Sequence, residues 1–175
     1  SFKRVLGRDA DAREASWVGD QLYVVAFAGA PHGKIVAVAP DGKATDVLPE
    51  GKGAIQHVTA LGDGFLVVRS AGPDWWADQY DAKASFVRRV PLPATGIAIG
   101  GVAAEKGQAK ALITYAGWTR PTQWAEYDGT SGSLKTIFEV KPAADYSKVR
   151  VTRVEGTSKD GSKIPVTVIA MDGTT

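Results

Sequence analysis

A turn, a hydrophobic strand and a closing Ala-Gly make up Val18-Gly19-Asp20-Gln21-Leu22-Tyr23-Val24-Val25-Ala26-Phe27-Ala28-Gly29, a stretch that the chain repeats. It returns as Leu61-Gly62-Asp63-Gly64-Phe65-Leu66-Val67-Val68-Arg69-Ser70-Ala71-Gly72 and, more loosely, as Lys106-Gly107-Gln108-Ala109-Lys110-Ala111-Leu112-Ile113-Thr114-Tyr115-Ala116-Gly117. The closing glycines are 43 and 45 residues apart. A period of about 40–50 residues, filled with short strands, is typical of β-propeller blades.

The segments between these stretches repeat as well. Turn residues bound short hydrophobic runs every eight to twelve residues, which indicates an all-β fold. Each unit contains four such runs in the same order, as a propeller blade requires. The predicted strands span 15–18, 21–27, 34–39 and 44–48; 55–61, 65–70, 75–80 and 85–91; 98–103, 109–115, 123–127 and 134–140. Helix signals are almost absent, and we expect at most one short helical turn, over 141–147.

A second mark shares this period. An aspartate turn follows the third strand of each unit, at Asp41, Asp81 and Asp128, with spacings of 40 and 47 residues. Aspartate favours the start of a reverse turn because its side chain accepts a hydrogen bond from the backbone two residues on. Residues 1–13 precede the first unit and are predicted to be the tail of a fourth blade.

Three blades do not close a ring, because propellers close with about four to eight. We therefore expect either that the chain oligomerises to close the ring or that it is a segment of a longer protein. The second possibility is favoured by the sequence after residue 143, where the strand pattern no longer follows the repeat of the blades. Residues 146–156 alternate like a half-buried strand, 158–162 form a tight turn, and 163–170 return as the partner strand.

Composition excludes several classes of function. The chain of 175 residues is 44% hydrophobic and carries a net charge of +2 spread evenly, which gives no support for nucleic acid as a partner. Its longest apolar runs are far too short to span a bilayer, so no membrane partner is expected. The chain contains no cysteine, which excludes disulfides and thiolate chemistry but leaves the compartment open.

The residues of the last hairpin carry a family resemblance. Thr157-Ser158-Lys159-Asp160-Gly161-Ser162-Lys163-Ile164-Pro165-Val166 closely resembles the hairpin that opens the catalytic domain in the prolyl oligopeptidase family of serine peptidases. Residues 28–36 are similar to a strand start of that family, and residues 79–81 and 113–128 are similar to its later blades. The resemblance is collinear and covers nearly the whole chain.

The resemblance implies a seven-bladed propeller that caps an α/β-hydrolase domain. Residues 1–143 would then hold three blades and the tail of a fourth, and residues 144–175 would begin the peptidase domain. The parent would be a serine-type endopeptidase that hydrolyses short peptides after proline, with the propeller gating access. Its partners would be short proline-containing peptides and the peptidase domain of the same chain.

The resemblance also places the catalytic serine, aspartate and histidine beyond Thr175. No Gly-x-Ser-x-Gly elbow is present, since Gly129-Thr130-Ser131-Gly132 has the wrong spacing. We therefore predict no catalytic, cofactor-binding or metal-binding residue in this segment. The alternative function is a stand-alone β-propeller that binds protein or sugar without catalysis.

The histidines and two loop motifs favour structural roles. His32 lies in a turn and His57 in a strand, 25 residues apart, with no metal-ligand pattern. The segment 29–35 is one residue short of a phosphate loop and lacks the Ser or Thr after Lys34. The segment 9–14 begins like a calcium loop, but Arg13 and Glu14 occupy positions where that loop needs a ligand and a glycine.

The sequence is compatible with two roles for four tryptophans. Trp75, Trp76, Trp118 and Trp124 are expected either to pack between blades or to form a rim that contacts peptide or a partner domain. Arg120 lies at a strand-to-strand crossing from which it would reach the catalytic domain. Two further cations, Lys148 and Arg150, share one strand face and are expected to be solvated.

Overall fold

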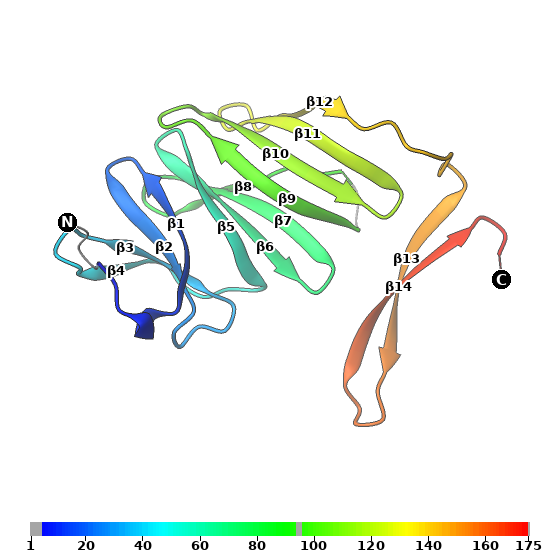
Figure 1. Cartoon of the computed structure of the whole chain (residues 1–175), viewed down its shortest axis with the longest axis horizontal. Helices are drawn as coiled ribbons and strands as arrows, with labels where there is room; N and C mark the ends of the chain where they lie inside the picture. Colours follow the sequence, from blue (N-terminus) through cyan, green and yellow to red (C-terminus); the bar gives the residue numbers. More distant parts are fainter. Residues whose placement is uncertain (1–4, 94–95, 175) are drawn as a thin grey trace.

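The computed structural model describes residues 5–93 and 96–174, and within these ranges it contains three four-stranded antiparallel sheets and a hairpin (Figure 1). Blade 1 consists of β1 (Ala12–Val18), β2 (Gln21–Ala26), β3 (Lys34–Val38) and β4 (Ala44–Leu48). Blade 2 consists of β5 (Ala54–Leu61), β6 (Gly64–Ala71), β7 (Asp74–Tyr80) and β8 (Phe86–Arg89). Blade 3 consists of β9 (Ile97–Ala104), β10 (Lys110–Gly117), β11 (Arg120–Asp128) and β12 (Leu134–Glu139), and the hairpin consists of β13 (Val149–Thr157) and β14 (Lys163–Met171).

The sequence explains why each blade is a simple meander. Val18 pairs with Gln21, and Leu61 pairs with Gly64, so two-residue turns join β1 to β2 and β5 to β6. Gly19 and Gly62 are the first residues of these turns and have φ of 59° and 58°. This conformation is unfavourable for residues that carry a Cβ, so glycine is preferred there. The repeated stretch is thus the turn and second strand of each blade, as its hydrophobic pattern predicts.

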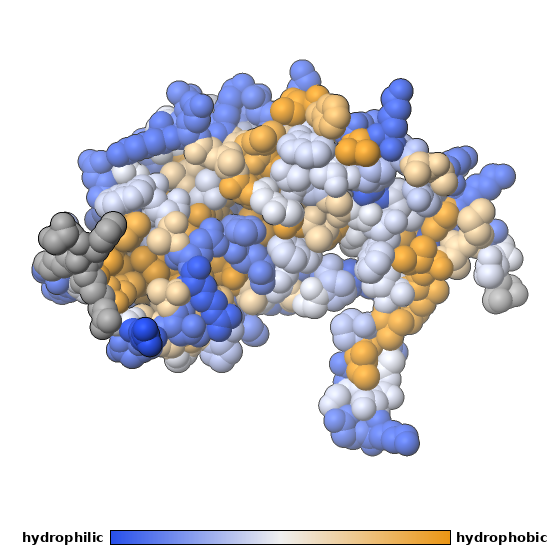
Figure 2. All heavy atoms as spheres, in the orientation of Figure 1, coloured by the Kyte–Doolittle hydropathy of each residue, from blue (hydrophilic) through white to orange (hydrophobic). Residues whose placement is uncertain are grey.

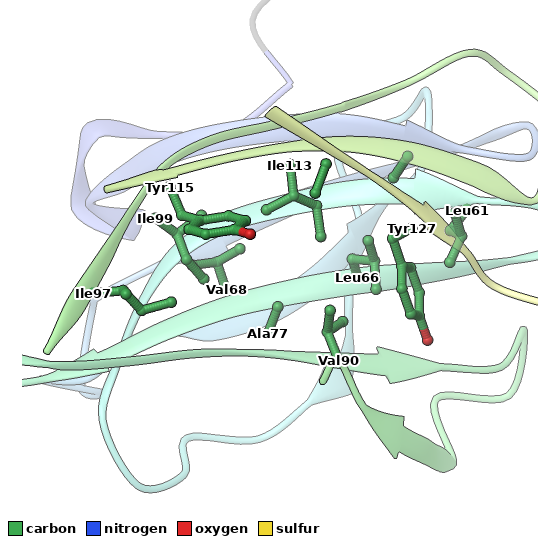
Figure 3. Close-up of a cluster of buried hydrophobic side chains, with 12 residues drawn as sticks. Leu61, Leu66, Val68, Ala77, Val90, Ile97, Ile99, Ile113, Tyr115 and Tyr127 are labelled. Carbon is green, nitrogen blue, oxygen red and sulfur yellow. The ribbon is translucent and has the colours of Figure 1, made fainter. Parts of the chain in front are cut away.

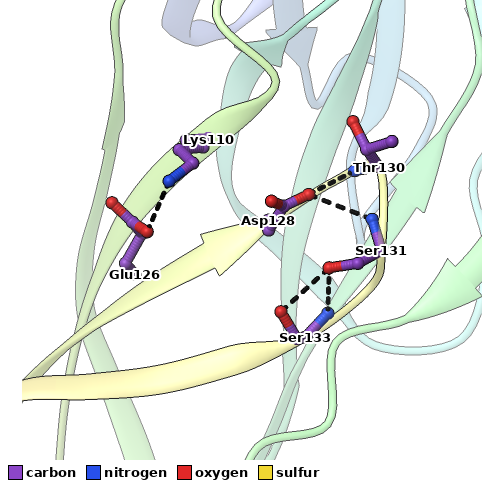
Figure 4. Close-up of polar contacts among 6 residues, drawn as sticks. All are labelled: Lys110, Glu126, Asp128, Thr130, Ser131 and Ser133. Atoms are coloured by element: carbon purple, nitrogen blue, oxygen red, sulfur yellow. Dashed lines mark hydrogen bonds and ion pairs between the residues drawn. The ribbon is translucent and has the colours of Figure 1, made fainter.

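The aspartate turns close the third and fourth strands of each blade. The Asp128 carboxylate accepts hydrogen bonds from the Thr130 and Ser131 amides at 2.8 and 3.0 Å (Figure 4). These bonds, chiefly the one from Ser131, lower the pKa of Asp128 below its usual value. Asp41 and Asp81 accept equivalent bonds from the amides two residues on. The predicted role of all three aspartates as local turn formers is confirmed.

Two hydrophobic clusters hold neighbouring blades together. The first strands of successive blades, β1, β5 and β9, lie next to one another. The cluster between blades 1 and 2 contains Val18, Tyr23, Val25, Ile35, Leu48, Ile55, Val58, Ala60, Phe65 and Val67. The cluster between blades 2 and 3 contains Leu61, Leu66, Val68, Ala77, Val90, Ile97, Ile99, Ala111, Ile113, Tyr115, Ala125 and Tyr127 (Figure 3). Burial of these side chains is the main stabilising term.

Two hydrogen bonds of Gln79 connect blades 2 and 3 beside the second cluster. The Tyr127 hydroxyl of blade 3 donates to Gln79 Oε1 of blade 2 at 2.7 Å, and Gln79 Nε2 donates to the Gly129 carbonyl at 3.0 Å. The pair thereby satisfies the polar end of a buried aromatic ring, which would otherwise oppose its burial.

The observed elements agree closely with the predicted ones. All twelve blade strands and both hairpin strands are present, and their order is as predicted. The segment 141–147 contains bends, coil and the start of a turn at Ser147, which agrees with the expectation of at most one short turn there. A 3-10 helical turn lies at Arg8–Ala10. Of the predicted tail 1–13, residues 1–4 lie outside the described part, and Val5 and Leu6 pack on the outer face of blade 1.

Candidate functional site at the hairpin-side rim

The loops of the blades separate into two edges. Because the strands are antiparallel, the aspartate turns and the turns between the first and second strands of each blade lie at one edge. The connections between second and third strands, and those between blades, lie at the other edge (Figure 1). We call the second edge the hairpin-side rim; it consists of residues 27–33, 49–53, 72–73, 90–93 with 96, and 118–119. The hairpin β13–β14 leaves the blades beside this rim (Figure 1). Contacts between rim and hairpin make it the first candidate for function.

Arg153 of β13 anchors the hairpin to the rim of blade 2. Its Nη2 donates to the Pro73 carbonyl at 3.2 Å and lies 3.1 Å from Asp74 Oδ1. Arg153 Nε is buried without a hydrogen-bond partner among the described residues. The guanidinium is therefore held between a carbonyl and a carboxylate at the junction of the two parts.

Two glycines of the rim, Gly72 and Gly96, lie next to the hairpin. A methyl group added to Gly96 would lie 3.6 Å from Val151 Cγ1 and 3.8 Å from Trp118 Cδ1. A methyl group added to Gly72 would lie 3.8 Å from Pro165 Cγ. Val151 and Arg153 lie on the half-buried face of β13, whereas Arg150 lies on its exposed face. The hairpin thus rests on the rim through side chains of both strands, Val151 and Arg153 of β13 and Pro165 of β14.

The tryptophans divide between the two readings. Trp75 packs against the cluster between blades 2 and 3, and Trp124 packs edge-on against Phe138 of its own blade, with ring centroids 5.3 Å apart. Trp118 is 61% exposed at the β10–β11 turn. Together with Trp75 it lines an apolar cavity of about 390 Å³ on the rim. Packing between blades is thus confirmed for Trp75, whereas Trp124 packs within its own blade. Trp118 is exposed on the rim, and its contact with peptide or a partner domain stays a prediction.

Arg153, and not Arg120, is the arginine that joins the hairpin to the rim. Arg120 Nη1 donates to Gln123 Oε1 at 3.5 Å within its own strand, so its reach toward a catalytic domain stays a prediction. Arg150 pairs with Asp172 on the hairpin and is exposed, as expected of its strand face, and Lys148 is exposed too. The cation that crosses to the rim is Arg153. The alternation of β13 carried the signal, since Arg153 shares a face with Val149 and Val151.

His32 and the two loop segments 29–35 and 9–14 form hydrogen bonds and ion pairs with neighbouring residues of the chain. The His32 amide donates to Glu50 Oε1 at 2.6 Å, and Lys34 pairs with Asp46 at 2.9 Å, so the segment 29–35 is an ordinary β2–β3 loop. In the segment 9–14, Asp11 pairs with Arg13 at 2.9 Å. Over residues 5–93 and 96–174, no three His, Cys, Asp or Glu side chains gather in a way that would hold a metal ion.

His57 forms an ion pair between blades. Its Nδ1 lies 3.3 Å from Glu14 Oε2, which joins β5 to β1, and Glu14 Oε1 accepts from the Val58 amide at 3.3 Å. The hydrogen bond that His57 donates to the Glu14 carboxylate raises the pKa of His57 above its ordinary value, and partial burial opposes this rise. The expected structural role of His57 is thus realised as a link between strands.

This link predicts a pH-dependent stability. A raised pKa means that the folded chain holds the proton more tightly, so the stabilisation is complete below the ordinary pKa of about 6.5 and is lost as the pH rises through the higher folded value. We expect the free energy of unfolding to fall over that range in urea titrations. His57→Gln should flatten the dependence. Glu14→Gln should flatten it as well, while its amide oxygen still accepts from Val58; an unchanged slope in both variants would contradict the assignment.

The rest of the hairpin presents apolar side chains to solvent. Figure 2 shows hydrophobic residues along the hairpin on the displayed face. The exposed apolar side chains of the two strands are Val154, Ile164, Val166, Val168, Ile169 and Met171. Exposed apolar residues gathered in this way mark surfaces that contact other protein. In the described ranges, no helix is long and apolar enough to cross a membrane.

Sheets of four antiparallel strands, packed through their first strands with a common repeat, define a segment of a β-propeller. A family model described as the prolyl oligopeptidase N-terminal β-propeller domain matches residues 2–140. The chain belongs to this family. No curated protein matches it.

Solved structures share the fold. One from a study of two prolyl endopeptidases has a TM-score of 0.81 and 22% identity, and covers 93% of this chain and 24% of that chain. The apo form of prolyl oligopeptidase B from Galerina marginata has a TM-score of 0.80 and 22% identity, covering 95% and 25%. Oligopeptidase B from Trypanosoma brucei, in a closed form with covalently bound antipain, has a TM-score of 0.70 and 17% identity, covering 94% and 26%. The chain spans about a quarter of the length of these proteins.

Proposed function

We propose that this chain is the non-catalytic propeller segment of a serine-type endopeptidase that hydrolyses short peptides after proline. The observation that carries the proposal is the family match over residues 2–140, which ends just before a hairpin seated on the rim. Residues 1–143 are then propeller blades, and residues 144–175 begin the α/β-hydrolase domain. Their apolar side chains would pack against the remainder of that domain.

In this proposal the rim faces the peptidase domain and controls access to it. Arg153 fixes the start of the peptidase domain against Asp74 and Pro73. The neighbouring loops, with the exposed Trp118, would cover the active site and admit short peptides while excluding folded proteins. Such a role is gating; the catalytic serine, aspartate and histidine are supplied by other parts of the enzyme.

An activity comparison tests the proposal. The 175-residue chain should not hydrolyse a chromogenic peptide with proline before the reporter group, whereas the whole protein that carries the chain should. Replacing that proline by alanine should slow the whole protein by about tenfold or more, because the proline pocket loses its contacts. The same proline site within a folded protein should stay uncut. Turnover by the chain alone, or equal rates on both peptides, would overturn the assignment.

A further inference from the structure

A charged cavity opens on the rim between blades 1 and 2. Its volume is about 400 Å³, and its wall comes from the β4–β5 connection and from β6, β7 and β8. The side chains that give it chemical character are Lys52, Arg69, Trp76, Asp78, Tyr80 and Arg89. The proposed peptidase function assigns no role to this cavity.

Arg69 is the unusual member of the wall. It is only 5% exposed, and its Nη1 donates to the Gly53 carbonyl at 3.3 Å. It also interacts with the Tyr80 side chain. No carboxylate of the described residues lies within 4.0 Å of the guanidinium, although a buried charge is normally paired. The guanidinium therefore brings into the cavity a positive charge that no described carboxylate balances.

The carboxylates of the cavity are already engaged. Asp78, also 5% exposed, accepts from Arg89 Nε and Nη2 at 2.9 and 3.4 Å in a forked pair. The Arg89 guanidinium in turn lies over the Trp76 ring, 5.3 Å from its centroid. The other lining carboxylate, Asp74, pairs with Arg153 of the hairpin. After these pairs are formed, Arg69 and the exposed Lys52 remain as the cations of the cavity.

We propose that this cavity binds a carboxylate, with Arg69 as the principal anchor and Lys52 as the cation at its mouth. The planar fork of a guanidinium matches the two oxygens of a carboxylate. The Trp76 ring offers an apolar surface beside the fork for the carbon chain that carries the carboxylate. The ligand class is thus a monocarboxylate on a short aliphatic chain, such as an acidic side chain of a peptide.

The same wall disfavours a phosphate dianion. Asp74 and Asp78 line the cavity, and a second negative charge on the ligand would be repelled by both carboxylates. The single charge of a carboxylate is balanced by the buried Arg69, and the exposed Lys52 lies at the mouth. The proposal goes beyond the peptidase assignment and does not depend on it.

A titration followed by NMR tests this site. The ¹H–¹⁵N signal of the Trp76 indole in the 175-residue chain, assigned with Trp76→Phe, reports on the cavity. N-acetylglutamate N-methylamide should shift the signal saturably in the millimolar range. The neutral N-acetylglutamine N-methylamide should bind at least about tenfold more weakly, because it lacks the charge that strengthens the bond to Arg69. Inorganic phosphate should bind no more tightly than the carboxylate.

Two variants and one control decide the result. Arg69→Gln should weaken carboxylate binding at least about tenfold, and Lys52→Met, on an exposed loop, should weaken it about threefold. Lys106→Met removes an exposed cation at the opposite edge, where Lys106 pairs with Asp20, and should leave binding unchanged. If Arg69→Gln does not fold, Lys52→Met and the neutral amide decide the matter. A shift that is absent, that the neutral amide reproduces, or that both variants retain overturns the proposal, as does tighter binding of phosphate.

Discussion

Replacing Phe65 by alanine is expected to lower the free energy of unfolding by about 3–5 kcal/mol, the range for a fully buried phenylalanine. The Phe65 ring is completely buried between blades 1 and 2. It meets Tyr23 edge-on and stacks on Tyr80, with ring centroids 5.2 and 5.3 Å apart. Alanine would remove both ring contacts and leave a cavity that the surrounding strands fill only in part. Urea denaturation followed by circular dichroism measures the change.

Phe86 provides a control of the same residue type. It is 59% exposed on β8 and meets Tyr80 edge-on at 6.1 Å. Phe86→Ala should change the free energy of unfolding by only about 0.5 kcal/mol, as is usual at exposed positions. Equal losses in the two variants would contradict the assignment of Phe65 to the junction between blades.

Gly53→Ala is expected to cost roughly 2–5 kcal/mol, the sum of backbone strain and a steric clash. Gly53 has a φ of 75°, which residues with a Cβ rarely adopt. An added Cβ would lie 2.8 Å from the Ser70 carbonyl oxygen and would collide with the Trp76 ring. The loop before β5 must then move away from β6. The same urea titration measures the loss.

Gly29→Ala separates the two causes of that loss. Gly29 has a φ of 67°, but apart from its two chain neighbours no described residue has an atom within 4 Å of the position of an added Cβ. Its substitution should therefore cost only the backbone term, about 1–2 kcal/mol. If Gly29→Ala is as damaging as Gly53→Ala, the clash with Trp76 does not contribute.

The strands were predictable because their causes are local. Alternating apolar residues, positive-φ glycines and aspartate turns each act within a few residues, so the order of all fourteen strands follows from the sequence. Three strands start three residues away from their predicted positions: β1 at Ala12, β11 at Arg120 and β13 at Val149. Pro121 lies where the register of β10 with β11 shifts between Tyr115 and Gly117. A proline without an N–H is tolerated at such an irregularity.

The rim and its cavity could not be predicted in the same way. Arg153 and Asp74 are separated by nearly 80 residues in the sequence. No local pattern indicates that Arg153, and not Arg120, is the arginine that joins the hairpin to the rim. The charge of Arg69 was hidden within the hydrophobic run of β6, because strand alternation places it on the same face as Phe65 and Val67. Both features arise only when separate blades come together.

Blade 2 is the one blade of the three that packs against a described blade on each side, and this order has a consequence for cooperativity. Stability in such a row is close to a sum of terms for each blade and each neighbouring pair. Loss of an outer blade removes one pair term, whereas loss of blade 2 removes both. Under native conditions the amides of β5 and β6 should therefore exchange with deuterium last, and those of the edge strands β4 and β12 in the two outer blades should exchange first. Blade 2 therefore contributes to both interfaces between the described blades, and its unfolding disrupts both.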